Sequence, residues 1–302
     1  MIIVNLKDGL GNQMFQYSLG YALSKKNDTN LSLDLRVLNE FKKNPPYDYT
    51  VRDYDLDIFN INYEKPKYKK ILKIFEIFPK YKHRFFISKI FDKLKMNTFL
   101  ERSRKYEYRI LESKNKNLYL DGYWQSEKYF SNYRNEILDI FNFKTIEHEK
   151  YNIDIIKKIN NLNSVCINVR RTDHVMEHAS ALDTVNIEYY KKAIEHLKKL
   201  EKSELHFFIF SDDIEWCKKN LSFIPNINFV DHGLYSGKKF YNYLYLMTQF
   251  KRFIIPNSTF AWWGAWLSKH KNKTVIVPAK WHKVDFHEAA DIIPDNWIVI
   301  NN

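Results

Sequence analysis

The sequence predicts an α/β protein built on parallel, doubly wound sheets. Short apolar runs rich in β-branched and aromatic residues alternate with segments of helical spacing, most regularly in the second half of the chain. Several of these runs end abruptly in polar residues. Strands joined by crossover helices run parallel, and repeated units of this kind build a doubly wound sheet.

The chain opens with a strand, a glycine-containing turn and a helix. Residues 2–6 form an apolar, β-branched run that the letters KDGLGN interrupt. Met14, Tyr17 and Tyr21 then recur at a spacing that places them on one helical face, which predicts a helix over residues 13–26. This is the opening unit of an α/β domain.

Two more strands and a basic segment fill the first half. Residues 30–38 alternate like a second strand, and residues 117–130 are typical of a strand followed by a turn and a helix start. Between them, residues 63–96 are rich in lysine and aromatic side chains, with Pro66 and Pro79 as interruptions. This segment fits either an amphipathic surface that lies on an anionic membrane or a pair of ordinary surface helices.

The second half repeats strand and helix regularly after a polar helical stretch, residues 141–163, that carries the predicted domain boundary. The predicted strands are residues 164–169, 205–213, 227–231, 252–256 and 274–278. The predicted helices are residues 187–200, 214–221, 240–250 and 258–270. The tryptophans of the last helix are explained by packing.

Composition narrows the classes of function and the compartment. The chain has 302 residues and a formal net charge of +12, which favours anionic partners such as nucleic acid, acidic lipids or phosphorylated substrates. Its N-terminus lacks the pattern of a signal peptide, and no long uncharged apolar stretch spans a membrane. Two cysteines without CxxC or histidine spacing indicate a reducing compartment. We therefore expect a cytoplasmic protein, with peripheral contact to the inner membrane face left open.

Ligands of doubly wound sheets bind beyond the carboxyl ends of the strands, which directs attention to RRTD, SDD, DHG and NSTF. Arg170 and Arg171 follow one strand, and an arginine fork suits a diphosphate. Successive side chains of a strand alternate, so at most one of the two points at a given ligand. The alternative is that both pair with structural carboxylates.

Acidic and hydroxyl side chains follow two other strands. Ser211, Asp212 and Asp213 can accept hydrogen bonds from guanine or ribose, or one carboxylate can cap the next helix. Asn257, Ser258 and Thr259 stand at a helix start, where backbone N–H groups and the helix dipole receive phosphates; simple capping by a hydroxyl is compatible with this.

The N-terminal glycine turn is a weaker signal. Gly9 and Gly11 permit close approach of a ligand to the backbone, and Asn12 and Gln13 offer side-chain amides there. The letters match neither GxGxxG nor a Walker motif. No HExxH motif or Cys/His cluster indicates a metal site.

Taken together, these motifs resemble glycosyltransferase family 11, the α-1,2-fucosyltransferases. The resemblance spans nearly the whole chain and follows the family's order. It rests on the segments GLGNQMFQYSLGYAL, INVRRTD, FSDD, LYLMTQF and PNSTFAWWGAWL.

The resemblance implies the GT-B architecture, two Rossmann-like domains facing a cleft. Residues 1–150, including the basic segment, would be the acceptor-side domain, and residues 151–302 would bind the GDP-sugar. It implies that L-fucose passes from GDP-fucose to an oligosaccharide acceptor, at the 2-hydroxyl of a galactoside. Transfer would invert the anomeric configuration without a required metal or other cofactor, in surface glycan or O-antigen synthesis.

The resemblance also implies roles for individual residues. Arg170 would contact the diphosphate, with Arg171 and Asp173 holding the loop, and Asp212 or Asp213 would read guanine or ribose. Asn12 would face the reacting centre from the other domain. The remaining donor-site residues implied by this pattern are Gly11, Ser211, Asn257, Ser258, Thr259 and Phe260.

Two positions depart from the family pattern. Asn168 stands where the family usually has histidine, and Asp8 where it usually has glycine. Asparagine does not titrate near neutral pH, so a base that deprotonates the acceptor must come from elsewhere. The candidates for that base are Asp8, Asp173, His174, Glu177 and His178.

Two other functions stay open at this point. One is a transferase for another GDP-sugar or another linkage, for which the two departures leave room. The other is a basic membrane- or nucleic-acid-binding module without catalysis, although the sequence carries no RNP-like or helix-turn-helix signature. We therefore expect no nucleic-acid partner.

Overall fold

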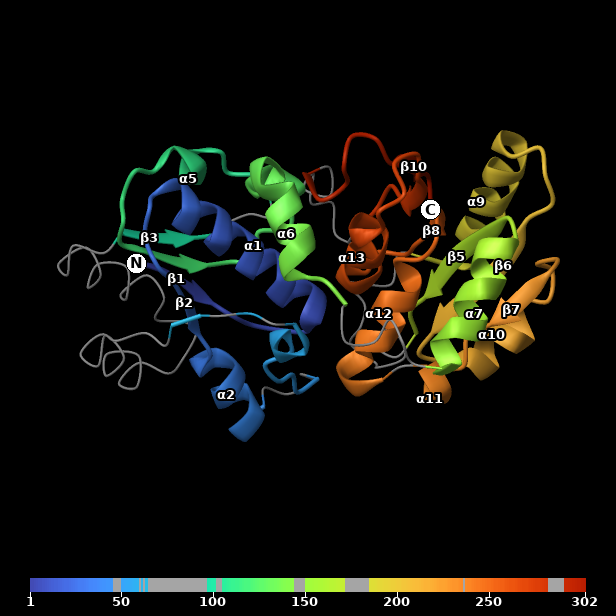
Figure 1. Cartoon of the computed structure of the whole chain (residues 1–302), viewed down its shortest axis with the longest axis horizontal. Coiled ribbons are helices and arrows are strands. Elements are labelled where there is room, and N and C mark those ends of the chain that lie inside the picture. Colours follow the sequence, from blue (N-terminus) through green and yellow to red (C-terminus); the bar gives the residue numbers. More distant parts are fainter. Residues whose placement is uncertain are drawn as a thin grey trace. The chain divides into compact units, whose positions relative to one another are not determined.

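The computed structural model of the chain describes residues 1–45, 50–59, 61, 63–64, 97–101, 105–143, 150–171, 185–235, 237–281 and 291–302. Two compact units form, unit 1 from Met1 to Ile140 and unit 2 from Phe141 to Asn302 (Figure 1). Each contains one parallel sheet with helices packed against it. The predicted α/β class with two Rossmann-like units is thus confirmed.

Unit 1 is built on a four-stranded parallel sheet in the order β2-β1-β4-β3. Its strands are β1 (Ile2–Asn5), β2 (Leu31–Asp34), β3 (Asn97–Leu100) and β4 (Leu118–Asp121). From β1 the chain adds β2 on one side, and β3 and β4 on the other. The carboxyl ends of β1 and β4 therefore flank the topological switch point, where open α/β sheets bind ligands.

The helices of unit 1 are α1 (Leu10–Lys26), α2 (Arg36–Lys43), α5 (Arg109–Glu112) and α6 (Arg134–Ile140), with 3₁₀ turns at Leu56–Ile58, Glu127–Tyr129 and Ser131–Tyr133. Helix α1 lies close to β1 and β2 because it carries Gly20. A Cβ atom at Gly20 would lie only 2.8 Å from Leu31 Cδ1 and would also clash with Val4.

Two local structures in unit 1 differ from the sequence prediction. The strand predicted over residues 30–38 ends at Asp34, whose carboxylate accepts the backbone N–H of Arg36 at 3.1 Å and so starts α2. Strand β3 was missed. Only residues 63–64 of the basic segment 63–96 are described, so the predictions for that segment lie outside the described residues.

Unit 2 contains a six-stranded parallel sheet in the order β10-β9-β8-β5-β6-β7. The strands are β5 (Ser164–Val169), β6 (His206–Ser211), β7 (Ile227–Phe229), β8 (Arg252–Ile254), β9 (Thr274–Pro278) and β10 (Ile298–Ile300). This is the strand order of dinucleotide-binding Rossmann folds, with the switch point between β5 and β8. The five predicted strands are present, and β10 was missed.

The helices of unit 2 are α7 (Lys150–Asn161), α9 (Ile187–Leu200), α10 (Ile214–Asn220), α11 (His232–Tyr235), α12 (Tyr241–Met247) and α13 (Thr259–Leu267), with a 3₁₀ turn at Lys238–Phe240. One face of the sheet packs on α9, where Tyr189 and Leu197 are fully buried and the Tyr189 hydroxyl donates to the carbonyls of Ile255 and Ile276 at 2.7 and 3.2 Å. Trp262, Trp263 and Trp266 are buried on α13, which confirms their predicted packing role.

No helix among the described residues is long and apolar enough to cross a membrane.

Candidate functional site

Two polar strand ends lie side by side at the carboxyl edge of the unit 2 sheet. Strand β5 pairs with β8, with Cys166 opposite Phe253 and Ile167 opposite Ile254. Arg170 therefore leaves the sheet next to the segment that runs from β8 into α13. Because this is the switch point, the arginines and the start of α13 lie at the edge of the sheet where ligands of doubly wound folds bind.

Asp212, which follows the neighbouring strand β6, organises both arginines. Its Oδ2 lies 3.4 Å from Arg170 Nε, and its Oδ1 accepts a 2.8 Å hydrogen bond from the backbone N–H of Arg171. The guanidinium of Arg171 stacks on Trp216 of α10, with Cζ 4.2 Å from the ring centroid. The Arg170 side chain stays 29% exposed. Arg170 thus has a carboxylate partner and still reaches solvent, whereas the guanidinium of Arg171 packs on an aromatic ring.

The other residues after β6 have local structural partners. Asp213 caps α10 by accepting the N–H of Trp216 at 2.9 Å. Ser211 is buried, and its Oγ accepts the backbone N–H of Asp213 at 3.0 Å. Of the three polar residues predicted there, Asp212 is the one beside the arginines.

The start of α13 presents backbone amides next to the arginines' strand. Ser258 is the N-cap, and its Oγ accepts the N–H of Ala261 at 3.4 Å. Asn257 donates from Nδ2 to the carbonyl of Trp281 at 3.0 Å, which ties the segment before the helix to the end of β9. Thr259 and Phe260 open the helix and are partly exposed. An anion placed here meets the positive end of the helix dipole.

Asn168 serves a structural role within the described residues. It is buried, and its Nδ2 donates to the carbonyl of Phe210 on β6 at 3.2 Å. The hydroxyl of Tyr190 donates to the Asn168 carbonyl at 3.1 Å. Burial raises the pKa of Tyr190, so this phenol remains a neutral donor. The position that departs from the family pattern therefore joins β5, β6 and α9.

At the switch point of unit 1, the loop after β1 leads directly into α1. The left-handed backbone there belongs to Asp8, with φ at 61°, whereas Gly9 is an extended N-cap and Gly11 lies inside α1. The turn before α1 thus has its left-handed residue at Asp8 rather than at either glycine. Asn12 stands in the first turn of α1, and its Oδ1 accepts a 2.6 Å hydrogen bond from Gln125 Nε2.

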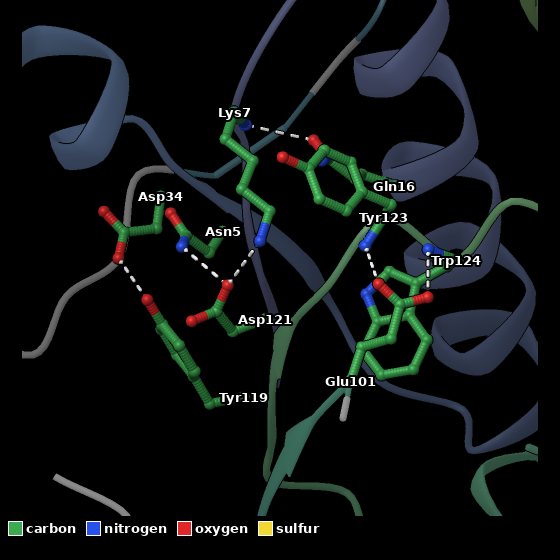
Figure 2. Close-up of polar contacts among 9 residues, drawn as sticks. All are labelled: Asn5, Lys7, Gln16, Asp34, Glu101, Tyr119, Asp121, Tyr123 and Trp124. Carbon is green, nitrogen blue, oxygen red and sulfur yellow. Dashed lines mark hydrogen bonds and ion pairs between the residues drawn. The ribbon is translucent and has the colours of Figure 1, made fainter. Parts of the chain in front are cut away.

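A buried polar network, which sequence reasoning missed, supports this edge of unit 1 (Figure 2). Lys7 Nζ lies 3.1 Å from Asp121 Oδ1, and both residues are almost fully buried. Asn5 Nδ2 donates to the same carboxylate oxygen at 3.1 Å. The available signal was a lysine and an aspartate directly after two apolar strands, a costly pair of residues to bury unless they meet.

Several predicted residues lie outside the described part of the chain. These are Asp173 and the base candidates His174, Glu177 and His178. Asp8 is the base candidate that the structure describes. Among the described residues, no group of three or more histidine, cysteine or acidic side chains could hold a metal ion.

Comparison with known proteins identifies similar sequences along the whole chain. The model of the family described as Glycosyl transferase family 11 matches residues 1–301. The chain is 33% identical to an alpha-1,2-colitosyltransferase of Escherichia coli, with 99% of each chain covered. It is 31% identical to the O-antigen biosynthesis glycosyltransferase WbnK of Escherichia coli, with 97% of this chain and 98% of the relative covered.

Comparison of folds finds the fucosyltransferase NodZ from Bradyrhizobium, with a TM-score of 0.50 and 15% identity over 87% of this chain and 90% of NodZ. A crystal of the NodZ alpha-1,6-fucosyltransferase soaked with GDP-fucose gives a TM-score of 0.51 and 13% identity over 90% and 96% of the two chains. At this level of identity the likeness concerns the fold alone. The fold class is the expected GT-B class.

Proposed function

Since the chain belongs to glycosyltransferase family 11, we propose that it transfers L-fucose from GDP-fucose to the 2-hydroxyl of a galactoside. The reaction inverts the β-linked donor to an α-1,2 product and requires no metal. The observation that carries the proposal is the place of Arg170 at the switch point of unit 2, where its strand β5 pairs with β8, the strand that leads into α13. The names of the relatives, a colitosyltransferase and an O-antigen glycosyltransferase, support the synthesis of a surface glycan.

The donor is proposed to bind in unit 2. The diphosphate lies between the guanidinium of Arg170 and the first backbone amides of α13, with hydroxyls of Ser258 and Thr259 nearby. Asp212 holds Arg170 and the backbone of Arg171, and the stacking of Arg171 on Trp216 fixes the loop that follows β5. An arginine anchored in this way is pre-organised for two phosphate oxygens.

The proposed chemistry places the residues where charge develops. As the bond between fucose C1 and the β-phosphate oxygen breaks, its electron pair stays on the phosphate, where Arg170 and the α13 amides stabilise the charge. The acceptor 2-hydroxyl oxygen bonds to C1 from the opposite face and loses its proton to a base. Asp8, in unit 1, is the described candidate for that base. The transition state resembles an oxocarbenium ion, so the proton leaves late.

A second donor, GDP-colitose, is favoured by one observation, the 33% identity to a colitosyltransferase over 99% of both chains. Colitose is fucose without its 3-hydroxyl group. A site that hydrogen-bonds this hydroxyl rejects the deoxy sugar by about 10⁴-fold, whereas a site without such a partner barely separates the two donors. The ratio of kcat/KM for the two donors therefore decides which sugar the site is built for.

The test combines binding and product analysis. The purified chain is titrated calorimetrically with GDP, and is then incubated with GDP-fucose or GDP-colitose and a panel of β-galactosides. We expect GDP to bind, GDP to be released only with acceptor, and NMR of the product to show an α-1,2 linkage. Absence of GDP binding and of turnover on the whole panel would overturn the proposal. A different linkage would retain the family and change the specificity.

The proposed site of action is the cytoplasm, where free thiols such as Cys166 and Cys217 stay reduced. Peripheral contact with the inner membrane face is proposed for the basic segment 63–96 on sequence grounds alone. Co-sedimentation with anionic vesicles, before and after the lysines of that segment are neutralised, tests this contact.

A further inference from the structure

We propose that the buried ion pair Lys7–Asp121 is a positioning device that sets the side-chain amide of Asn12 at the acceptor edge of unit 1. This inference rests on the proposed function, because it concerns the acceptor side of the same reaction. Burying the two charges of this pair is costly. The Lys7 and Asp121 side chains are only 5% and 7% exposed, and a buried ion pair contributes little net stability compared with apolar residues of similar volume.

The pair ties together the elements that flank the switch point. The ammonium of Lys7 contacts Asp121 at the end of β4, while its backbone N–H donates to Gln16 Oε1 of α1 at 3.1 Å. The ammonium also lies over the ring of Tyr123, 4.5 Å from its centroid. Lys7 therefore joins the loop after β1, the helix that carries Asn12 and the loop after β4, as Figure 2 shows.

Both loops carry backbone strain where the pair holds them. Asp8 has a φ of 61°, which aspartate adopts more readily than most residues, and Trp124 has a φ of 55°, where a bulky residue is a genuine outlier. Glu101 fixes the second loop by accepting the backbone N–H groups of Tyr123 at 2.6 Å and Trp124 at 3.1 Å. Strain of this kind persists only where the surroundings over-determine it, and it clusters at ligand sites.

Beyond the strained residues, a side-chain hydrogen bond joins the loop after β4 to the first turn of α1. Gln125, which follows Trp124, donates to Asn12 Oδ1 at 2.6 Å. This bond occupies the oxygen of the Asn12 amide and leaves its NH₂ group as the end that is presented to a ligand. The consequence of the Lys7–Asp121 pair is thus a hydrogen-bond donor of fixed direction at the switch point of unit 1. A hydroxyl oxygen of the acceptor sugar is the proposed partner of this donor.

The decisive variant removes both charges and keeps both shapes. Lys7→Met combined with Asp121→Asn leaves no uncompensated buried charge, so the double variant is expected to fold where either single variant risks unfolding. We expect its GDP Kd to stay within about twofold of wild type, because the nucleotide binds unit 2. We expect its kcat/KM for the acceptor to fall at least tenfold because KM rises, since the Asn12 amide no longer points in the direction that binds the acceptor.

Two further variants separate positioning from stability. Lys7→Arg keeps the charge, and its KM for the acceptor is expected to lie closer to that of wild type than to that of the Lys7→Met/Asp121→Asn variant. Arg252→Met with Glu201→Gln removes a partly buried pair in unit 2, where Arg252 Nε lies 2.5 Å from Glu201 Oε1 at the start of β8. This control is expected to lower the melting temperature and leave the acceptor KM unchanged.

A readout that needs no substrate distinguishes failure of this inference from failure of the proposed function. In ¹⁵N-labelled protein, the side-chain amide signals of Asn12 and Gln125 report their hydrogen bond, and we expect both to shift in the Lys7→Met/Asp121→Asn variant. If those signals and the acceptor KM match wild type, the pair is purely structural and the inference is overturned. An inactive wild type that still binds GDP would overturn the proposed transfer, and the amide signals would then decide the inference alone.

Discussion

Arg170 and Arg171 are neighbours in sequence with different surroundings, and this difference assigns their roles. Arg170 is held by the carboxylate of Asp212 and reaches solvent, whereas Arg171 stacks on Trp216 and its buried Nε has no hydrogen-bond acceptor among the described residues. A guanidinium that is to meet a diphosphate needs both an anchor and access. On this ground Arg170 is the proposed phosphate contact and Arg171 the brace.

Replacing each arginine in turn tests this assignment. Arg170→Ala is expected to lower kcat/KM by at least about 100-fold, since a donor to the leaving group is lost, and to weaken GDP binding. Arg170→Lys should keep part of the activity and of the GDP affinity, because lysine keeps the charge but cannot bond two phosphate oxygens at once. Arg171→Ala should cost about 1 kcal/mol of stability through the lost cation–π contact, with a smaller kinetic effect. Steady-state kinetics and GDP calorimetry measure all three, and a larger loss of GDP affinity in Arg171→Ala would reverse the roles.

Asp8 occupies a left-handed backbone conformation that glycine adopts without strain. Asp8→Gly is therefore expected to be more stable than Asp8→Ala by about 1 kcal/mol, measured by chemical unfolding. Kinetics then separate the two readings of this side chain. If Asp8 is only a turn residue, Asp8→Gly transfers fucose like wild type. If its carboxylate accepts the proton of the acceptor hydroxyl, Asp8→Gly and Asp8→Asn both lose activity.

At the scale of elements, one ion pair links the end of α9 to the start of β8. Glu201 is the C-cap of α9, and its two carboxylate oxygens accept from Arg252 Nε and from a terminal guanidinium nitrogen at 2.5 and 2.7 Å. The hydrogen bond from Arg252 lowers the pKa of Glu201. Because this carboxyl pKa is lower in the folded state, the ion pair stabilises the fold at pH values above the unfolded-state pKa of about 4.3. The stabilisation is lost as the pH falls through the lower folded-state pKa.

This linkage predicts a pH-dependent difference between wild type and Arg252→Met. We expect the variant to unfold more easily at pH 7. The difference between the two proteins should shrink as the pH falls below about 4.3 and then through the lower folded-state pKa, where Glu201 becomes protonated in both states. Urea unfolding at a series of pH values measures it. Lys218→Met, which removes an exposed i,i+3 partner of Glu215, is the control and should change stability little at any pH. A constant difference for Arg252→Met from pH 7 to pH 3 would contradict this account.

The elements that the sequence predicts correctly have a clear apolar pattern in their own residues, and the elements that it misses do not. Strand β5 and helix α9 were predicted with the bounds that the structure gives them. Burial imposes a largely apolar run on the strand and a regular apolar face on the helix. Strand β10 has a partly exposed pattern at the sheet edge, so its apolar signal is weak. The strand predicted through residue 38 was cut short by a bond from Arg36 to Asp34, which alternation of side chains does not report.

At the scale of the molecule, the sequence located the polar strand ends of unit 2 but not their adjacency. Alternation predicts parallel strands, yet it does not say that β8 pairs with β5, which brings the end of Arg170's strand next to the strand that leads into α13. The Lys7–Asp121 pair was missed for the same reason, because β1 and β4 are neighbours in space and more than a hundred residues apart in sequence. The residues of both candidate sites come together through the pairing of strands that are distant in sequence. The pattern of one sequence predicts each strand but not which strands lie side by side.

The division into two units predicts where GDP protects the chain. GDP at about 100 times its Kd stabilises the state that binds it by about 2.7 kcal/mol, so amides that exchange through opening of the binding site slow by about 100-fold. We expect this protection in unit 2, at residues 168–171, 211–213 and 257–262, where the strand ends and the start of α13 meet the nucleotide. Residues 5–13 and 121–126 of unit 1, which hold the proposed acceptor edge, should change little with GDP alone.

Hydrogen exchange followed by mass spectrometry measures both sets in one experiment. The Arg170→Ala variant should lose the protection of unit 2 at the same GDP concentration. Protection confined to residues 5–13 and 121–126 would instead assign the nucleotide to the switch point of unit 1 and exchange the proposed roles of the two units.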